Sequence, residues 1–111
     1  MKRPQPSMRF IREGVTNNQY RLTKHATIFR LKRGIIMAHL KLALLNGEII
    51  ETYPDAEPYP ACLVLGWLSS GDPLHIVCSR GDTEPQLRIV TMYEPDDTRW
   101  EDDYKTRKVH R

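Results

Sequence analysis

The fold of this chain is decided by residues 47–95, which read GEIIETYPDAEPYPACLVLGWLSSGDPLHIVCSRGDTEPQLRIVTMYEP. Short apolar, β-branched runs are separated here by Pro, Gly, Asp and Ser at intervals of roughly ten residues, a pattern typical of strands joined by turns. The runs predict four strands, at 48–53, 62–68, 74–79 and 87–93. Because the connections are short, these strands are expected to pair in order and antiparallel, since a parallel pair needs a crossover of about a dozen residues.

The segment before these strands has helical spacing instead. Thr23 is a good N-cap for a helix predicted over 24–33, and Gly34 supplies the left-handed residue that ends it. A second helix is predicted over 36–45, where the apolar residues fall on one face. The sequence therefore predicts an α+β fold in which two N-terminal helices pack on a four-stranded antiparallel sheet.

The two ends of the chain differ from this central part. Residues 1–18 are basic, contain Pro and Asn and show little periodicity, so they predict a flexible basic N-terminal arm. Residues 19–106 are predicted to form a single α+β domain, and 107–111 a basic tail. On this interpretation, removal of the arm leaves the stability of the domain nearly unchanged.

Composition narrows the class of protein. With 111 residues, 40% of them hydrophobic and 28% charged, the chain has room for one ordinary globular core. No apolar run approaches the ~20 residues of a membrane span, and the N-terminus lacks the pattern of a secretory signal, so a cytoplasmic location is expected. Cys62 and Cys78 lie in predicted strands without the spacing of a zinc or redox motif, which favours buried free thiols.

Positive charge is concentrated in the predicted helices. Between Lys24 and Lys41 there are five basic residues and no acidic one, within a net charge of +3. Such a patch can contact phosphates or an acidic partner, and it can equally be a solvated helix face. Both interpretations stay open at this point.

Four stretches together resemble a bacterial family known as domain of unknown function 4258. They read LTKHATIFRLKRGI at 22–35, LNGEIIETYPDAEPYPACLVLG at 45–66, DPLHIVCSR at 72–80 and LRIVTMYEPDDTRW at 87–100. The chain departs from the family pattern at Phe29, where an arginine is expected. The family looks like a relative of the RelE, ParE and BrnT toxins, which also place two helices on an antiparallel sheet. The resemblance implies an endoribonuclease toxin that acts on messenger RNA, without a cofactor, and a cognate antitoxin that is often a small zinc-binding protein.

RNA cleavage without a metal ion requires a base for the 2′-hydroxyl, an acid for the leaving oxygen and cations for the phosphorane. The candidates for these catalytic roles are His25, Arg33, His75 and Tyr93. His25 follows a helix N-cap, where the helix dipole favours the neutral base, and the alternative is a histidine bonded to backbone. His75 alternates with apolar neighbours, which fits either a site residue or a partly buried structural histidine. Tyr93 ends a strand and can stack on a base or serve packing.

Further cations are candidates for binding RNA. They are Lys24, Arg30, Lys32 and Arg88. Arg30 and Arg33 lie three residues apart, so they are expected to share a helix face and grip a phosphate, unless that face is merely solvated. No set of residues has metal-ligand spacing, and no metal site is predicted.

Two functions follow from these observations. The first is a ribonuclease toxin that is held inactive by a partner covering its basic face. The second is a non-catalytic module of the same fold that binds protein or nucleic acid. Convergence of His25, His75 and the arginines on one concave surface favours the enzyme, and their separation favours the module.

Overall fold

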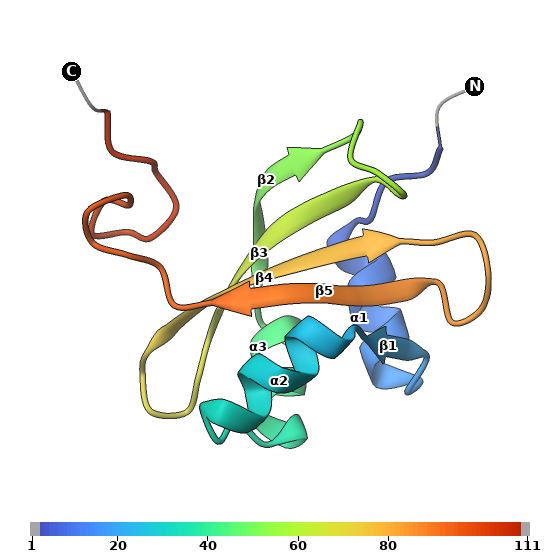
Figure 1. Cartoon of the computed structure of the whole chain (residues 1–111), viewed down its shortest axis with the longest axis horizontal. Helices are drawn as coiled ribbons and strands as arrows, with labels where there is room; N and C mark the ends of the chain where they lie inside the picture. Colours follow the sequence, from blue (N-terminus) through green and yellow to red (C-terminus); the bar gives the residue numbers. More distant parts are fainter. Residues whose placement is uncertain (1–2, 110–111) are drawn as a thin grey trace.

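The computed structural model describes residues 3–109, which form three helices and one five-stranded sheet (Figure 1). In chain order the elements are α1 (Met8–Thr16), β1 (Tyr20–Leu22), α2 (Lys24–Lys32), α3 (Met37–Leu45), β2 (Glu48–Tyr53), β3 (Ala61–Trp67), β4 (Pro73–Arg80) and β5 (Leu87–Tyr93). Among residues 3–109, none of the helices has the length and apolar character needed to cross a bilayer.

The sheet is mixed, which corrects the expectation of four antiparallel strands. Its order is β1-β5-β4-β3-β2, and the strands β2 to β5 form the expected antiparallel meander. The additional strand, β1, pairs in parallel with β5, so that Tyr20 lies opposite Leu87. Parallel pairing is possible because two helices and three strands separate β1 from β5 and provide the long crossover it needs.

The prediction of a flexible arm is wrong for residues 8–16, which form α1. Ser7 caps this helix, its side-chain oxygen accepting a hydrogen bond from the Phe10 amide at 3.1 Å. Ile11 and Val15 are four residues apart, so they share one face of the helix, and both are buried in the core. Within the described chain α1 is therefore a third helix that contributes to the core, whereas residues 1–2 lie outside the described range.

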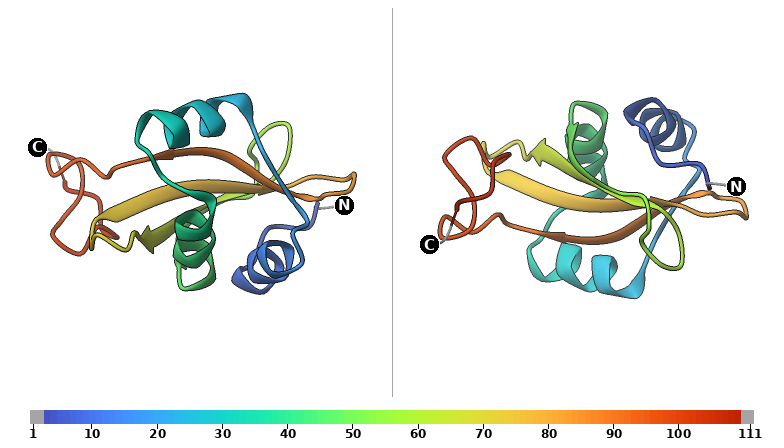
Figure 2. Two further views of the ribbon diagram at one scale, coloured as in Figure 1. Left: turned by 90° about the horizontal axis from the view of Figure 1, so that it is seen from below. Right: turned by 90° about the horizontal axis from the view of Figure 1, so that it is seen from above.

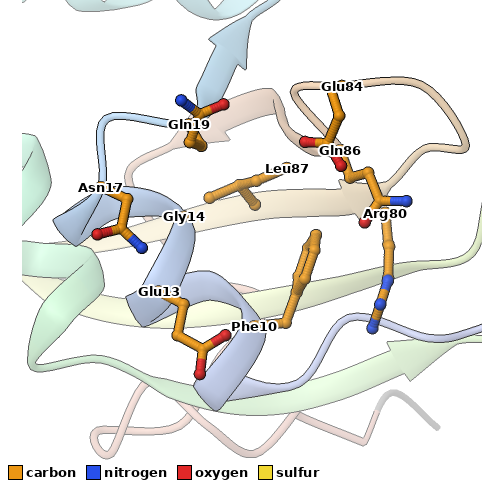
Figure 3. Close-up of a pocket in the computed structure, with 9 residues that line it drawn as sticks. All are labelled: Phe10, Glu13, Gly14, Asn17, Gln19, Arg80, Glu84, Gln86 and Leu87. Atoms are coloured by element: carbon orange, nitrogen blue, oxygen red, sulfur yellow. The ribbon is translucent and has the colours of Figure 1, made fainter.

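Figure 3 shows where α1 packs against the sheet, beside the end of β4 and the start of β5. The guanidinium carbon of Arg80 lies 4.5 Å from the centroid of the Phe10 ring, a cation–π contact between β4 and α1. Gly14 lies so close to β5 that a Cβ there would be 2.8 Å from Leu87 Cδ2. This glycine permits the close approach, because any larger side chain would push the helix off the sheet.

The two faces of the sheet have different covers. The inner face carries alternate residues such as Cys62, Val64, Ile76 and Ile89, and it forms one core with α1 and α3. Both cysteines are buried free thiols, as predicted. In Figure 2, α1 and α3 lie on one side of the sheet, while α2 lies on the other side, beside β5.

The outer face carries the residues in between, including Leu63, Leu65, His75 and Tyr93. Leu63 and Leu65 are fully buried here and are not members of the core cluster that the inner face forms with the helices. The C-terminal segment, defined here as residues 94–109, contacts this face, because its Tyr104 carbonyl is bonded to His75 and its Lys105 and Arg107 pair with acids of β2. In Figure 1 the segment loops beside the end of β5. The C-terminal segment therefore packs against the outer face of the sheet.

Candidate functional site at the end of β5

His75 lies on the outer face of β4 and is fully buried. Its Nε2 is 2.7 Å from the carbonyl oxygen of Tyr104, which can only accept, so Nε2 must carry the proton. The remaining nitrogen, Nδ1, is then free to accept a hydrogen bond from the Tyr93 hydroxyl at 3.3 Å. The Trp100 ring stands edge-on to the imidazole, with ring centroids 4.5 Å apart. Every polar atom of His75 therefore has a partner when the ring is neutral.

The surroundings of His75 oppose its protonation. Burial lowers the pKa of His75 below its usual 6.5, against smaller opposing effects from the Tyr104 carbonyl and Glu51. Burial also raises the pKa of Tyr93, so its phenol keeps its proton at neutral pH. Sequence reasoning predicted both residues as site candidates, and the structure joins them directly through the hydrogen bond across β4 and β5.

Tyr93 is half-buried and opens onto a cleft of about 310 Å³ at the end of β5. This β5 cleft is lined by Tyr93, Glu94, Asp96, Arg99, Trp100 and Arg107. The cleft combines a phenol, two guanidinium groups and an indole ring, which are groups that bind phosphates and stack on bases. Its acidic residues limit the net positive charge.

One of these guanidinium groups is fixed by a carboxylate of β2. Arg107 donates two hydrogen bonds to Glu51, from Nε at 2.7 Å and from Nη2 at 2.9 Å, and it lies over the Trp100 ring at 4.6 Å. Tyr53 donates to the same carboxylate at 2.5 Å. Hydrogen bonding to Arg107 lowers the pKa of Glu51, and burial, together with Glu51, raises the pKa of Tyr53 to about 12. This network holds the C-terminal segment on the outer face.

Sequence analysis missed the C-terminal contribution to the site. It assigned Arg107 to a basic tail, whereas this residue pairs with Glu51, and Lys105 pairs with Glu48 at 2.8 Å. The similar spacing of two acids in β2 and two bases in the segment is a signal of their pairing, although many other acids compete for it. Residues 110–111 of the predicted tail lie outside the described residues.

Arg33 reaches the same end of the sheet from α2. It follows the last residue of that helix, and its guanidinium group forms an ion pair with Glu94, the residue after β5. Arg33 and Glu94 line a second hollow, of about 260 Å³, together with Tyr104. Three of the four predicted catalytic residues, His75, Tyr93 and Arg33, thus gather around the end of β5.

The other candidates on α2 lie apart from this group. His25 and Lys24 are exposed in the first turn, after Thr23 has capped the helix, and Lys32 is exposed in the last turn. Arg30 is half-buried and donates from Nη1 to the Ile35 carbonyl at 3.0 Å, so it clamps the connection to α3. Arg30 and Arg33 therefore do not present a paired grip.

Arg88 lies at the opposite end of β5 from the β5 cleft. Its side chain is half-buried on the outer face, opposite Ser79 of β4, and its guanidinium carbon is 5.3 Å from the centroid of the Tyr59 ring. The eight predicted site residues are thus divided among four places: the end of β5, the exposed side of α2, the connection from α2 to α3, which Arg30 holds, and the start of β5.

The relationship of the chain to known proteins agrees with the resemblance seen in its sequence. Residues 22–94, more than half of the chain, match the model of a family described as "Domain of unknown function (DUF4258)". The chain belongs to the DUF4258 family. No curated protein and no solved structure matches it.

The DUF4258 match contains all eight predicted site residues but stops at residue 94. It includes the pair His75 and Tyr93, whereas Trp100, Tyr104 and Arg107 lie beyond it. Two of the six residues that line the β5 cleft, Tyr93 and Glu94, therefore lie in the matched region, and the other four come from the segment that follows it. The helix α1 also lies outside the match.

Proposed function

We propose that this chain is the toxin of a bacterial toxin–antitoxin pair and acts in the cytoplasm as an endoribonuclease on messenger RNA, with the β5 cleft as its active site. The observation that carries the proposal is the Tyr93 hydroxyl, which donates to the neutral ring of His75 while its phenol lines an open cleft with Arg99. The likeness of the DUF4258 family to the RelE, ParE and BrnT toxins is a second support.

The proposed reaction is attack of the RNA 2′-oxygen on the adjacent phosphorus. The new bond gives a 2′,3′-cyclic phosphate, and the bond to the 5′-oxygen breaks to leave a 5′-hydroxyl. Tyr93 takes the proton of the 2′-hydroxyl as its own proton moves to Nδ1 of His75. The Tyr104 carbonyl stabilises the resulting imidazolium through Nε2. The imidazolium then returns this proton through the Tyr93 hydroxyl to the leaving 5′-oxygen, so that one proton is removed and one delivered.

In this scheme, cationic side chains stabilise the negatively charged phosphorane. Arg99 lines the β5 cleft, and Arg33 is held beside it by Glu94. Guanidinium groups placed beside the reacting phosphate stabilise the negative charge that develops on the phosphorane. Lys24 and Lys32, exposed on α2, extend the positive surface along the RNA. Because side chains supply every proton and charge in this scheme, cleavage is expected to continue in excess chelator.

The decisive experiment compares Tyr93→Phe with Tyr20→Phe, a second partly buried tyrosine on the distant strand β1. Loss of the Tyr93 hydroxyl should reduce RNA cleavage about 10²- to 10⁴-fold, the range expected for positioned acid–base catalysis, while Tyr20→Phe retains full activity. Circular dichroism verifies that both variants are folded. Equal cleavage by wild type and Tyr93→Phe would remove Tyr93 from the mechanism.

The proposed surface for binding the antitoxin is on α2. Ile28 and Leu31 are 42% and 64% exposed on this helix, between Lys24 and Lys32. Apolar residues exposed among cations suit a protein surface of acidic, amphipathic character, such as the proposed zinc-binding antitoxin. Expression of the chain alone is expected to stop bacterial growth, and co-expression of its chromosomal neighbour to restore it.

A second candidate function is a binding module without catalysis. It is favoured by the complete burial of His75, both of whose ring nitrogens already have partners within the protein. RNA binding by a wild-type protein that cleaves no RNA, after removal of any partner, would establish this function in place of the toxin.

A further inference from the structure

Two arginines lie directly opposite each other where β1 meets β5. Arg21 and Arg88 are register partners in this parallel pair, so their side chains leave the sheet on the same face. Like charges in opposite positions repel, and the pair is retained only where something offsets the repulsion. Among residues 3–109, neither arginine forms an ion pair with a carboxylate.

An aromatic ring completes the surroundings of this pair. The Tyr59 ring lies beneath the guanidinium group of Arg88, and its hydroxyl donates to Asp82 at 2.9 Å. Arg21, Tyr59 and Arg88 line a hollow of about 320 Å³, with the loop between β4 and β5 as a further wall. Asp82 is the carboxylate that is hydrogen-bonded to Tyr59, and its single negative charge does not balance the two positive charges of Arg21 and Arg88.

Two further polar side chains lie next to residues of this hollow. Ser79 is the neighbour of Arg88 on β4, and its hydroxyl oxygen is buried without a hydrogen-bond partner, an arrangement that normally costs stability. Arg3 donates to the Pro58 carbonyl, which brings a third guanidinium group to the Tyr59 loop, although a carboxylate, Glu57, lies 3.7 Å from it.

The hollow and the β5 cleft lie on the same face of β5. Register places Arg88 opposite Ser79, Thr91 opposite Val77 and Tyr93 opposite His75, and these three positions of β4 alternate with the inner face. Tyr93 lies five residue positions after Arg88 along the strand, a span of about 17 Å at roughly 3.3 Å per residue. A single strand of a few nucleotides covers that span.

We infer that Arg21, Arg88 and Tyr59 form a phosphate-binding subsite for single-stranded RNA that lies along the outer face of β5. The two guanidinium groups bind the backbone phosphate, and Tyr59 holds the Arg88 guanidinium in place by stacking. The identity of the ligand as RNA rests on the proposed function. The phosphate chemistry rests on the arginine pair itself.

The test measures binding separately from cleavage. A 2′-O-methyl oligonucleotide of about eight nucleotides lacks the attacking hydroxyl, so fluorescence anisotropy reports its affinity without turnover. Arg21→Gln and Arg88→Gln are compared with Arg9→Gln, an exposed arginine of α1 that pairs with Glu13. Each of the first two changes should weaken binding about tenfold, the effect of losing a charged hydrogen bond. Each should also reduce the slope of the logarithm of the binding constant against the logarithm of salt concentration by about 0.7.

The possible results of these binding measurements test the phosphate subsite and the proposed nuclease activity separately. Affinities of Arg21→Gln and Arg88→Gln within twofold of wild type would overturn the subsite, even if Tyr93→Phe abolishes cleavage. Weakened binding in these two variants, in a protein that cleaves no RNA, would leave the subsite standing and overturn the nuclease. Failure of the wild-type protein to bind the oligonucleotide would overturn both.

Discussion

A single hydrogen atom decides the state of the His75 and Tyr93 pair. With Nε2 donating to the Tyr104 carbonyl, Nδ1 can accept from Tyr93 only while the imidazole is neutral. A second proton on Nδ1 would face the phenol donor, and it would place a positive charge in a fully buried position. At the residue scale, His75 therefore links pH to both stability and the proposed proton transfer.

The stability of the protein should depend on pH through His75. Because burial lowers its folded-state pKa below 6.5, the unfolded chain binds this proton more readily in the interval between the two values. The free energy of unfolding should therefore fall as the pH drops below about 6.5, and this contribution should level off below the folded-state pKa. Urea denaturation at pH 7.5, 6.5 and 5.5 measures the effect.

Two variants isolate the contribution of His75. His75→Gln should lose the pH dependence between pH 7.5 and 5.5, while His25→Gln, which changes an exposed histidine, should retain it. A wild-type profile that is flat over this interval would contradict a lowered pKa at His75. Glu51 acts at lower pH, because hydrogen bonding to Arg107 keeps its pKa below 4.5.

At the scale of elements, α1 is the largest departure from what the sequence predicted. Ile11 and Val15 have the spacing of a helix face, but two apolar residues in a polar stretch are also compatible with an unfolded arm. The helix forms because α3 and the sheet bury those two side chains, and isolated helices of nine residues are not stable in water. Tertiary packing therefore provides the stability of α1, which the local spacing of its apolar residues does not predict.

The contribution of α1 to stability can be measured at one residue. Ile11→Ala removes a fully buried side chain, so the free energy of unfolding should fall by about 2 to 5 kcal/mol. Arg9→Ala, on the exposed face of the same helix, should change it by less than about 0.5 kcal/mol. Thermal or urea unfolding of both variants gives the comparison, and an unchanged Ile11→Ala protein would restore the interpretation of a dispensable arm.

The remaining elements were predicted closely, and for local reasons. The strands at 48–53 and 87–93 have the predicted bounds, because Pro54, Gly47 and Pro95 interrupt the chain around them. The sequence predicts a short extended segment at Tyr20–Leu22, where β1 lies, but its pairing with β5 could not be predicted because the partner lies far along the sequence. The His75 and Tyr93 contact follows from predictable strands, but its register depends on a bulge between β4 and β5.

At the scale of the whole molecule, the C-terminal segment closes one end of the outer face. It is attached to β2 by Arg107 and Lys105 and to β4 through the Tyr104 carbonyl, and its own Trp100 is only 3% exposed. Salt bridges at partly exposed positions contribute little individually, so the burial of Trp100 is expected to provide most of the attachment. The sequence is compatible with a short terminal helix packed through Trp100 and Tyr104, but residues 94–109 form no helix, so this part of the interpretation is wrong.

Substitution of Trp100 should therefore loosen the segment and expose His75. Trp100→Ala removes the indole ring 4.5 Å from the imidazole, and it should lower the free energy of unfolding by about 3 to 5 kcal/mol. Water that enters the space reduces the desolvation that lowers the pKa of His75, so this pKa should rise toward 6.5.

Trp67→Ala is the matched control for this prediction. Trp67 is 48% exposed, and it contacts Tyr104 edge-on with ring centroids 5.8 Å apart, so it touches the same segment without burying the imidazole. NMR titration of the His75 ring protons should show the pKa rise in Trp100→Ala and not in Trp67→Ala. Because the titration follows only the folded protein, it remains informative even if the variant is less stable. An unchanged His75 pKa in a folded Trp100→Ala protein would show that other parts of the sheet keep this ring dry, and that the C-terminal segment does not control access to the β5 cleft.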